Sequence, residues 1–133
     1  MTFLKAYLAT GIVFAVLDAL WLGVVAKGFF QSQLGDLMRA RILFAPAVAF
    51  YLLFIAGLVV FAVLPGHESG KGLINAALLG GFFGLVAYAT YDLTNLSTLK
   101  GWPVKMVAVD LVWGTALSAA CAAGGWQVLQ MWR

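Results

Sequence analysis

The chain alternates long apolar stretches with short polar ones. The apolar stretches cover about residues 3–26, 42–64, 73–95 and 103–126. An α-helix needs roughly 20 apolar residues to cross the hydrocarbon core of a bilayer, and each stretch is long enough. The pattern therefore predicts an all-α membrane protein, a four-transmembrane-helix up-down bundle with short loops, in a single domain over residues 1–133.

Composition favours the same class. Hydrophobic residues make up 64% of the chain and charged residues only 10%, whereas soluble domains contain about 25% charged residues. Such a chain cannot cover a soluble surface with polar groups, so we expect lipid to surround it. The first apolar stretch is too long for a typical signal peptide, and it contains Asp18, so we interpret it as a membrane span.

The segments between the spans predict short connections. Phe30, Leu34, Leu37 and Met38 lie at helical spacing, which predicts either a short amphipathic helix over 29–40 at the membrane interface or an ordinary connector. The second connection is a flexible turn that contains the single histidine, His67. The third turns sharply at Lys100-Gly101-Trp102-Pro103.

Basic residues predict the orientation. Loops one and three contain Lys27, Arg39, Arg41, Lys100 and Lys105. The opposite side contains Lys5, Lys71 and Arg133. This excess predicts that loops one and three are cytoplasmic and that both termini are outside. The basic residues form no stripe or patch of the kind that binds nucleic acid, so we expect no nucleic-acid partner.

Three aspartates lie within the spans or at their ends: Asp18, Asp92 and Asp110. No lysine or arginine lies in the middle of a span to pair with them. A charged aspartate at the bilayer centre costs about 2.5 to 3.5 kcal/mol even on a lenient scale. We therefore expect these side chains to face the bundle interior and to form a functional site.

Helix geometry places polar groups from all four spans at one depth. At 1.5 Å per residue, Asp18, Tyr51, Tyr88 and Asp110 lie roughly 10 to 14 Å below the same membrane face. Because an apolar medium disfavours the ionised form of a carboxyl group, we expect at least one of Asp18 and Asp110 to be protonated near neutral pH.

The third span presents a polar stripe. Tyr88, Tyr91, Asp92 and Asn95 lie at positions i, i+3, i+4 and i+7, which share one face of a helix. Phenols and an amide next to carboxylates can share protons and hydrogen bonds in a low dielectric. We expect Asp92 and Asn95 to line the way out of the site.

Tryptophans follow two of the aspartates at the same interval. Asp18-x-x-Trp21-x-Gly23 resembles Asp110-x-x-Trp113-Gly114, which suggests either a duplicated helical hairpin or a chance match. In a helix each tryptophan shares a face with its aspartate. We expect Trp21 and Trp113 to form the apolar wall of the site.

A structural interpretation of the same residues stands beside the functional one. Asp92 could form a salt bridge with a basic residue at a helix end, namely Arg39, Arg41, Lys100 or Lys105. Asp18 could hydrogen-bond to Tyr51 or to the Trp113 indole, with Asp110 bonding Trp21. The aspartates would then only fix the packing of the helices.

Small residues predict close helix packing. Gly80 and Gly84 have the GxxxG spacing that lets a neighbouring helix approach. Packing within the chain is the first interpretation, and a homodimer through these glycines is the alternative.

Several kinds of site are excluded by what the chain lacks. One histidine and one cysteine, Cys121, cannot form a di-iron histidine cluster, a bis-histidine haem site, an iron–sulfur site or a multi-cysteine zinc site. There is no phosphate-binding glycine loop and no nucleophile elbow. We predict no cofactor and no metal; magnesium held by the carboxylates and Asn95 is an alternative without a recognised ligand motif.

One run resembles a known family. Tyr-Asp-Leu-Thr-Asn-Leu at 91–96, followed by Thr-Leu-Lys-Gly-Trp-Pro at 98–103, is similar to the signature of the bacterial membrane family labelled domain of unknown function 2177. Asp18 with Trp21 and Asp110 with Trp113 fit the same pattern. The resemblance implies a small four-span protein of the bacterial inner membrane, and it transfers no catalytic residue.

These observations favour a binding protein. The leading hypothesis is that a small or amphiphilic ligand binds in the intramembrane pocket, as in a carrier or proton-coupled transporter, with membrane lipids around it. The first alternative is a membrane enzyme that acts on a lipid or isoprenoid by carboxylate and tyrosine acid–base chemistry. The second is an accessory membrane subunit with structural aspartates.

Overall fold

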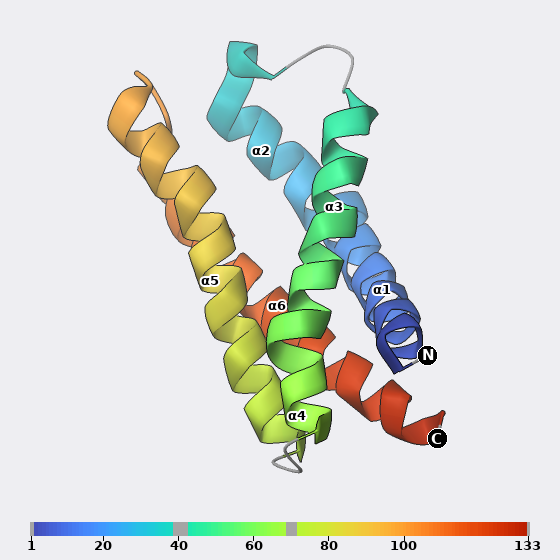
Figure 1. Cartoon of the computed structure of the whole chain (residues 1–133). Coiled ribbons are helices and arrows are strands. Elements are labelled where there is room, and N and C mark those ends of the chain that lie inside the picture. The colour runs from blue at the N-terminus through green and yellow to red at the C-terminus, as the bar shows by residue number, and fades with distance from the viewer. Residues whose placement is uncertain (1, 39–42, 69–71, 133) are drawn as a thin grey trace.

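The structure is a computed structural model that describes residues 2–38, 43–68 and 72–132. It confirms an all-α bundle for this part of the chain (Figure 1). Four helical segments are long and apolar enough to cross a membrane, namely Thr2–Val24, Phe44–His67, Gly72–Thr98 and Val104–Met131. Arg39, Arg41, Lys71 and Arg133, which entered the orientation prediction, lie outside the described residues.

The first two spans each contain a turn of π-helix. The first span comprises α1 (Thr2–Leu20) and the π-helical segment η1 (Trp21–Ala26) as far as Val24; α2 (Lys27–Leu34) continues the helix beyond it, and a short 3-10 turn, η2 (Gly35–Leu37), follows. The second consists of α3 (Phe44–Leu58), the π-helical segment η3 (Val59–Val63) and α4 (Leu64–Glu68).

The helix after the first span differs from the predicted element at 29–40. The structure has no break at residue 26, and α2 continues directly from η1. Gly35 adopts φ +54° just after α2, a conformation that glycine adopts without strain, so the α-helix ends at Leu34. Helical spacing alone could not distinguish a separate interfacial helix from this extension.

The last two helices are α5 (Gly72–Thr98) and α6 (Val104–Met131). Both run past the predicted ends at residues 95 and 126. Gly101, at φ +75°, makes the tight turn between them, and Pro103 stands at the N-cap of α6. A proline cannot continue a preceding helix without losing a backbone hydrogen bond, so the chain turns here.

Glycines set the distance between α5 and α6. A Cβ added to Gly80 would collide with Ala122, and a Cβ added to Gly84 would collide with Ser118. Both glycines are buried. This face of α5 is therefore occupied within the chain, as the first interpretation of the glycine motif predicts.

A glycine also lets α6 pack closely against α1, where a Cβ on Gly125 would collide with Thr10. The hydrophobic core lies beside these contacts and includes Leu58, Val63, Leu117 and Cys121. Nearby, Gln130 Nε2 donates a hydrogen bond of 2.7 Å to His67 Nδ1, which connects α4 to α6. The single histidine thus has a structural partner.

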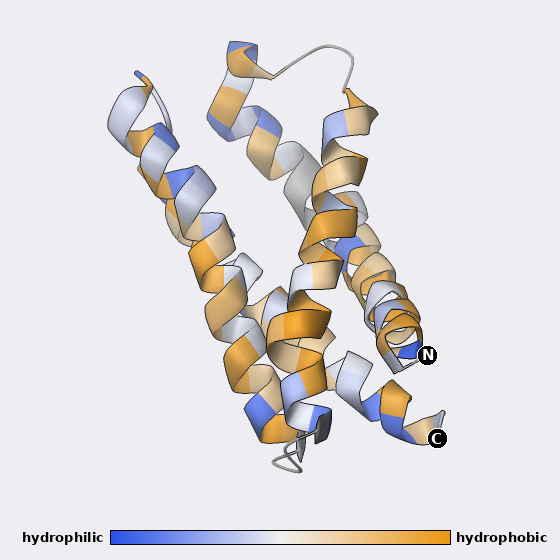
Figure 2. Ribbon diagram, viewed as in Figure 1, coloured by the Kyte–Doolittle hydropathy of each residue, from blue (hydrophilic) through white to orange (hydrophobic). Residues whose placement is uncertain are grey.

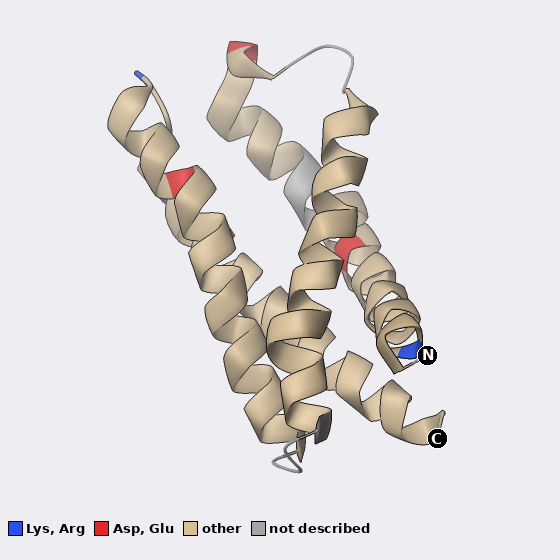
Figure 3. Cartoon of the chain, viewed as in Figure 1, with Lys and Arg blue, Asp and Glu red and all other residues tan. Residues whose placement is uncertain are grey.

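The helices spread apart from this core towards the connections after α2 and α5, while both termini lie at the opposite end (Figure 1). Apolar residues predominate along the ribbon (Figure 2), and many of them are exposed; Val112 and Ile74, for example, are 72% and 67% exposed. Charged residues are sparse along the ribbon (Figure 3). An apolar exterior of this kind suits the hydrocarbon region of a bilayer.

Candidate functional site

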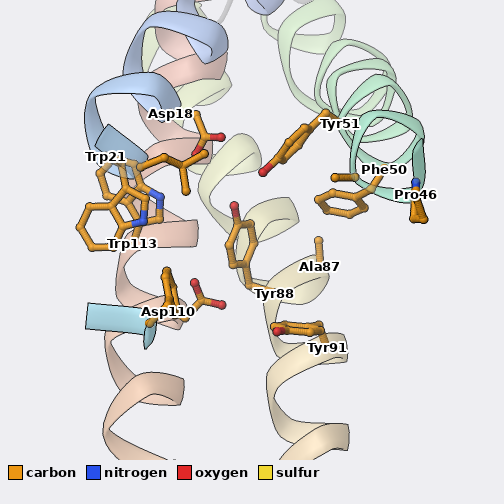
Figure 4. A pocket seen from close by; sticks show the side chains of 13 residues that line it. Asp18, Trp21, Pro46, Phe50, Tyr51, Ala87, Tyr88, Tyr91, Asp110 and Trp113 are labelled. Atoms are coloured by element: carbon orange, nitrogen blue, oxygen red, sulfur yellow. The ribbon is translucent and has the colours of Figure 1, made fainter. Parts of the chain in front are cut away.

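A pocket of about 610 Å³ lies where the helices spread apart. Pockets that bind small molecules commonly have volumes of roughly 300 to 1,000 Å³. The lining comes from all four spans and from α2 (Figure 4). Its residues are Asp18, Trp21, Leu22, Phe30, Pro46, Ala47, Phe50, Tyr51, Ala87, Tyr88, Tyr91, Asp110 and Trp113.

Most of the sequence-predicted site residues meet in this pocket. Those that line it are Asp18, Trp21, Tyr51, Tyr88, Tyr91, Asp110 and Trp113. These residues come from all four spans, which the prediction from counting residues along each span requires. Asp92 and Asn95 are not part of the lining.

Asp18 and Tyr51 form one side of the pocket. Asp18 is buried, with 8% of the residue exposed, and the Tyr51 hydroxyl points towards its carboxyl group (Figure 4). The Tyr51 ring packs against Phe14, with 5.3 Å between ring centroids. Packing of the ring thus aims the phenol at the carboxyl group.

A pair of stacked tryptophans next to Asp18 forms another part of the wall (Figure 4). The Trp21 and Trp113 rings are almost parallel, at 11°, with centroids 4.3 Å apart. Trp21 is the first residue of η1, and π-helical turns are frequent at functional sites. The two segments with similar Asp-x-x-Trp sequences therefore contribute one shared wall.

A second hollow lies on the other side of this wall. It has a volume of about 430 Å³. Trp21 and Trp113 line it together with Ala108, Val109, Val112 and Ala116. Because Val112 is 72% exposed, this apolar hollow faces outward. The tryptophan pair therefore separates the polar pocket from the outer surface of the bundle.

Tyr88 depends on a glycine of the neighbouring helix. A Cβ added to Gly114 would overlap the Tyr88 ring, so only glycine leaves room for the ring against α6. From this position the Tyr88 hydroxyl points towards Tyr51 and Asp18 (Figure 4). The Gly114 that follows Trp113 thus positions a pocket residue on another helix.

Asp92 is in a different place from the one predicted. Its side chain is completely buried and lies close to the carboxyl group of Asp110, but neither oxygen has a hydrogen-bond partner. Successive helical residues are rotated by about 100°, so Tyr91 and Asp92 diverge from Tyr88 in opposite directions. Tyr91 reaches the pocket, while Asp92 turns towards α6.

The two remaining expectations for this helix have different outcomes. Asn95 lies one turn beyond Tyr91 on α5 and is half-buried. The salt bridge that the structural interpretation offered for Asp92 is not formed with Lys100 or Lys105, because neither Asp92 oxygen has a hydrogen-bond partner among the described residues. Its other proposed partners, Arg39 and Arg41, lie outside those residues.

Sequence reasoning missed much of the apolar lining. The missed residues are Leu22, Phe30, Pro46, Ala47, Phe50 and Ala87. A signal for Ala47 was available, since it stands one helical turn before Tyr51 and shares its face. No comparable signal existed for Phe30, which reaches the pocket only because α2 continues the first span.

The chemistry of the described lining is acidic and aromatic. Its ionisable side chains are Asp18 and Asp110 together with the phenols of Tyr51, Tyr88 and Tyr91. Among the described residues, no three His, Cys, Asp or Glu side chains gather in a cluster that could hold a metal ion. The magnesium alternative therefore gains no support from the geometry.

Comparison with known proteins fits this membrane architecture. A family described as predicted membrane proteins matches residues 3–127, which include most of every span. The chain belongs to the family labelled domain of unknown function 2177. No curated protein and no solved structure matches it. Membership in this family and the four apolar helices together establish a multi-pass membrane protein, and the family description assigns no activity.

Proposed function

We propose that this protein binds a small or amphiphilic ligand in the pocket and carries it, coupled to proton movement, in the bacterial inner membrane. One observation supports this most: acidic and phenolic side chains from separate spans line a single pocket of about 610 Å³ in a chain with few charges. Carboxyl groups at this depth are costly, and ionisable groups inside membranes typically serve substrate or proton pathways.

Each part of the lining has a role in this proposal. Asp18 and Asp110 bind and release protons, and Tyr88 and Tyr91 hold the polar end of the ligand. The stacked tryptophans hold its apolar part. The sequence suggested Asp92 as a ligand contact, but its side chain does not reach the pocket. In this proposal Asp92 influences the ligand only indirectly, through its neighbour Asp110.

The test is ligand-dependent thermal stabilisation of the purified protein in detergent. Wild type is heated with a panel of cationic, anionic and neutral amphiphiles, and we expect at least one class to raise the unfolding temperature. The increase should disappear in Asp18→Asn and Asp110→Asn. The control is Asp36→Asn, because Asp36 is exposed and does not line the pocket. A shift of the same size in all three variants would refute the proposed site.

The orientation follows from the basic residues: loops one and three are cytoplasmic in this proposal. It can be measured with single cysteines in a Cys121→Ala background. Ser32 is exposed on α2 and Lys5 is exposed near the opposite end, so Ser32→Cys and Lys5→Cys report opposite faces. A membrane-impermeant thiol reagent added to intact spheroplasts should label Lys5→Cys only.

One observation favours the enzyme alternative as a second candidate. Asp18 and Asp110 line one pocket from different helices, and Phe50 and Tyr91, which also line it, are 45% and 50% exposed. A carboxyl pair with such access could serve as general acid and base towards a lipid. Lipid extracts of cells that express wild type or Asp110→Asn would differ by a converted lipid if this alternative holds.

A further inference from the structure

The pocket combines two features that together select one class of ligand. More than half of its lining side chains are aromatic: Trp21, Phe30, Phe50, Tyr51, Tyr88, Tyr91 and Trp113. The only carboxyl groups in the described lining are those of Asp18 and Asp110, and that lining contains no lysine, arginine or histidine.

Aromatic rings and carboxylates attract the same kind of molecule. The face of an aromatic ring is electron-rich and draws a cation placed within about 6 Å of its centre, most strongly for tryptophan. Carboxylate groups attract the same cation, and the attraction increases where water and its high dielectric constant are absent. An anion would be repelled by both features.

The cation that fits is organic rather than a metal ion. Hard metal ions need six or more oxygen ligands, and the described residues contain no cluster of three acidic or metal-binding side chains. A pocket of about 610 Å³ with mostly aromatic walls instead matches a bulky cation that carries apolar groups. Quaternary ammonium groups are recognised by aromatic cages of this kind.

We propose that the pocket binds lipophilic organic cations, such as hydrophobic amines, quaternary ammonium ions and phosphonium ions. This inference rests on the proposed function and names its ligand class. The charge of the ligand lies between Asp18 and Asp110, and its apolar groups contact the tryptophan pair and the tyrosine rings. The rings supply an attraction that requires no fixed hydrogen-bond geometry, so cations of different shapes can bind.

Binding and protonation then compete. A proton on Asp110 removes the negative charge that attracts the cation. The titratable groups that face Asp110 are Asp92, Tyr88 and Tyr91 on α5 and Tyr51 on α3, and Asp18 on α1 lines the same pocket. All of them are acids, so acidification can only reduce the negative charge around the ligand. Release of a cation on proton uptake is the coupling that an exchanger needs.

Two ions of matched shape and opposite charge provide the test. Tetraphenylphosphonium and tetraphenylborate differ in charge but are nearly identical in size, so their ratio of affinities isolates the electrostatic part of binding. Affinities are measured by isothermal titration calorimetry with the purified protein in neutral detergent. We expect the phosphonium ion to bind and the borate ion to bind at least about tenfold more weakly. Equal affinities, or a tighter borate, would overturn the inference.

Variants locate the binding and separate two effects of the pocket. Asp18→Asn and Asp110→Asn should each weaken phosphonium binding by about ten- to a hundredfold, because each removes a carboxyl group that can carry the negative charge opposite the bound cation. Trp113→Phe should weaken it by several-fold only, since it keeps a ring with a less electron-rich face. Asp36→Asn should bind like wild type. Unchanged affinity in both pocket aspartate variants would contradict the inference.

A measurement without substitutions covers the case in which a variant does not fold. Wild-type affinity for the phosphonium ion should fall as the pH is lowered, and an affinity that is constant or rises would count against the inference. The proposed ligand class and the proposed function can also be tested separately. If a neutral amphiphile binds in an Asp18- and Asp110-dependent manner and the phosphonium ion does not, the ligand class is wrong and the proposed function stands. If no amphiphile of any charge binds, both fail.

Discussion

Gly84 offers the sharpest test of how the bundle is held together. In Gly84→Ala the new Cβ would lie 2.6 Å from the carbonyl oxygen of Gly114 and would collide with the Ser118 side chain. Carbon–oxygen contacts between helices normally lie at about 3.3 Å or more, so the carbonyl alone requires α6 to retreat by roughly 0.7 Å. The Ser118 hydroxyl group can rotate, but the Ser118 Cβ, which would lie even closer to the new Cβ, and the backbone carbonyl cannot, and the retreat therefore loosens the whole interface.

The expected magnitude follows from two opposing effects. Overpacking of this kind costs about 1 to 3 kcal/mol, and the involvement of the backbone places Gly84→Ala near the upper end. Replacing glycine by alanine inside a helix stabilises the helix by about 1 kcal/mol and offsets part of this cost. The net loss is about 2 kcal/mol, which corresponds to a roughly thirtyfold change in the unfolding equilibrium.

The assay is unfolding in mixed micelles with an increasing fraction of SDS, followed by circular dichroism. Gly23→Ala is the matched control, because a Cβ at that helical position would have nothing within 4 Å. We expect Gly23→Ala to unfold at the wild-type SDS fraction or above it, and Gly84→Ala to unfold well below. If Gly84→Ala were as stable as Gly23→Ala, close packing at this glycine would not hold α5 against α6.

Three further outcomes are expected. Gly114→Ala should displace the Tyr88 ring, lower the stability and weaken ligand binding. Adding Tyr88→Ala should restore the stability measured by unfolding but not the binding measured by calorimetry. Asp92→Leu should raise stability by about 1 to 3 kcal/mol, because the fully buried oxygens lack partners; a loss of stability in SDS unfolding would indicate a bonded partner. Tyr51→Phe should leave stability within about 1 kcal/mol yet weaken cation binding, since only the hydroxyl that faces Asp18 is removed.

The sequence was sufficient for the spans and for the level of the site. Hydrophobic length locates a transmembrane helix because the bilayer has a fixed thickness, and the constant rise of a helix then gives the depth of Asp18, Tyr51, Tyr88 and Asp110. These quantities depend on one helix at a time. Counting residues therefore predicted which polar groups could meet.

The rotation of each helix could not be predicted in the same way. Asp92 and Tyr91 are adjacent, and which of them faces the pocket depends on how α5 docks against α6. That docking is determined by the contacts of Gly80, Gly84 and Gly114 with partners on the facing helix. A single sequence gives the glycines but not the residues that fill the space opposite them.

The continuation of the first span into α2 was also beyond a local pattern. Apolar spacing at 30, 34 and 37 is the same for an interfacial helix and for a helix that simply extends. The π-helical turn that begins at Trp21 changes the helix repeat there, and no residue pattern in the span predicts this turn. As a result the pattern could not show that Phe30 reaches the pocket.

The glycine contacts also make the stiffness of the molecule uneven. α6 packs closely against α5 and α1 at glycines where even one added Cβ would collide with the facing helix. In contrast, residues 44–50 of α3 are exposed except for the half-buried Ala47, and a hydrogen bond of 2.9 Å from the Tyr7 hydroxyl to the Leu52 carbonyl lies just below them. Displacing this end of α3 breaks few contacts, whereas separating α5 from α6 would disrupt the tightest interface in the described chain. We therefore expect α1, α5 and α6 to move as one rigid unit and the exposed end of α3 to move relative to them.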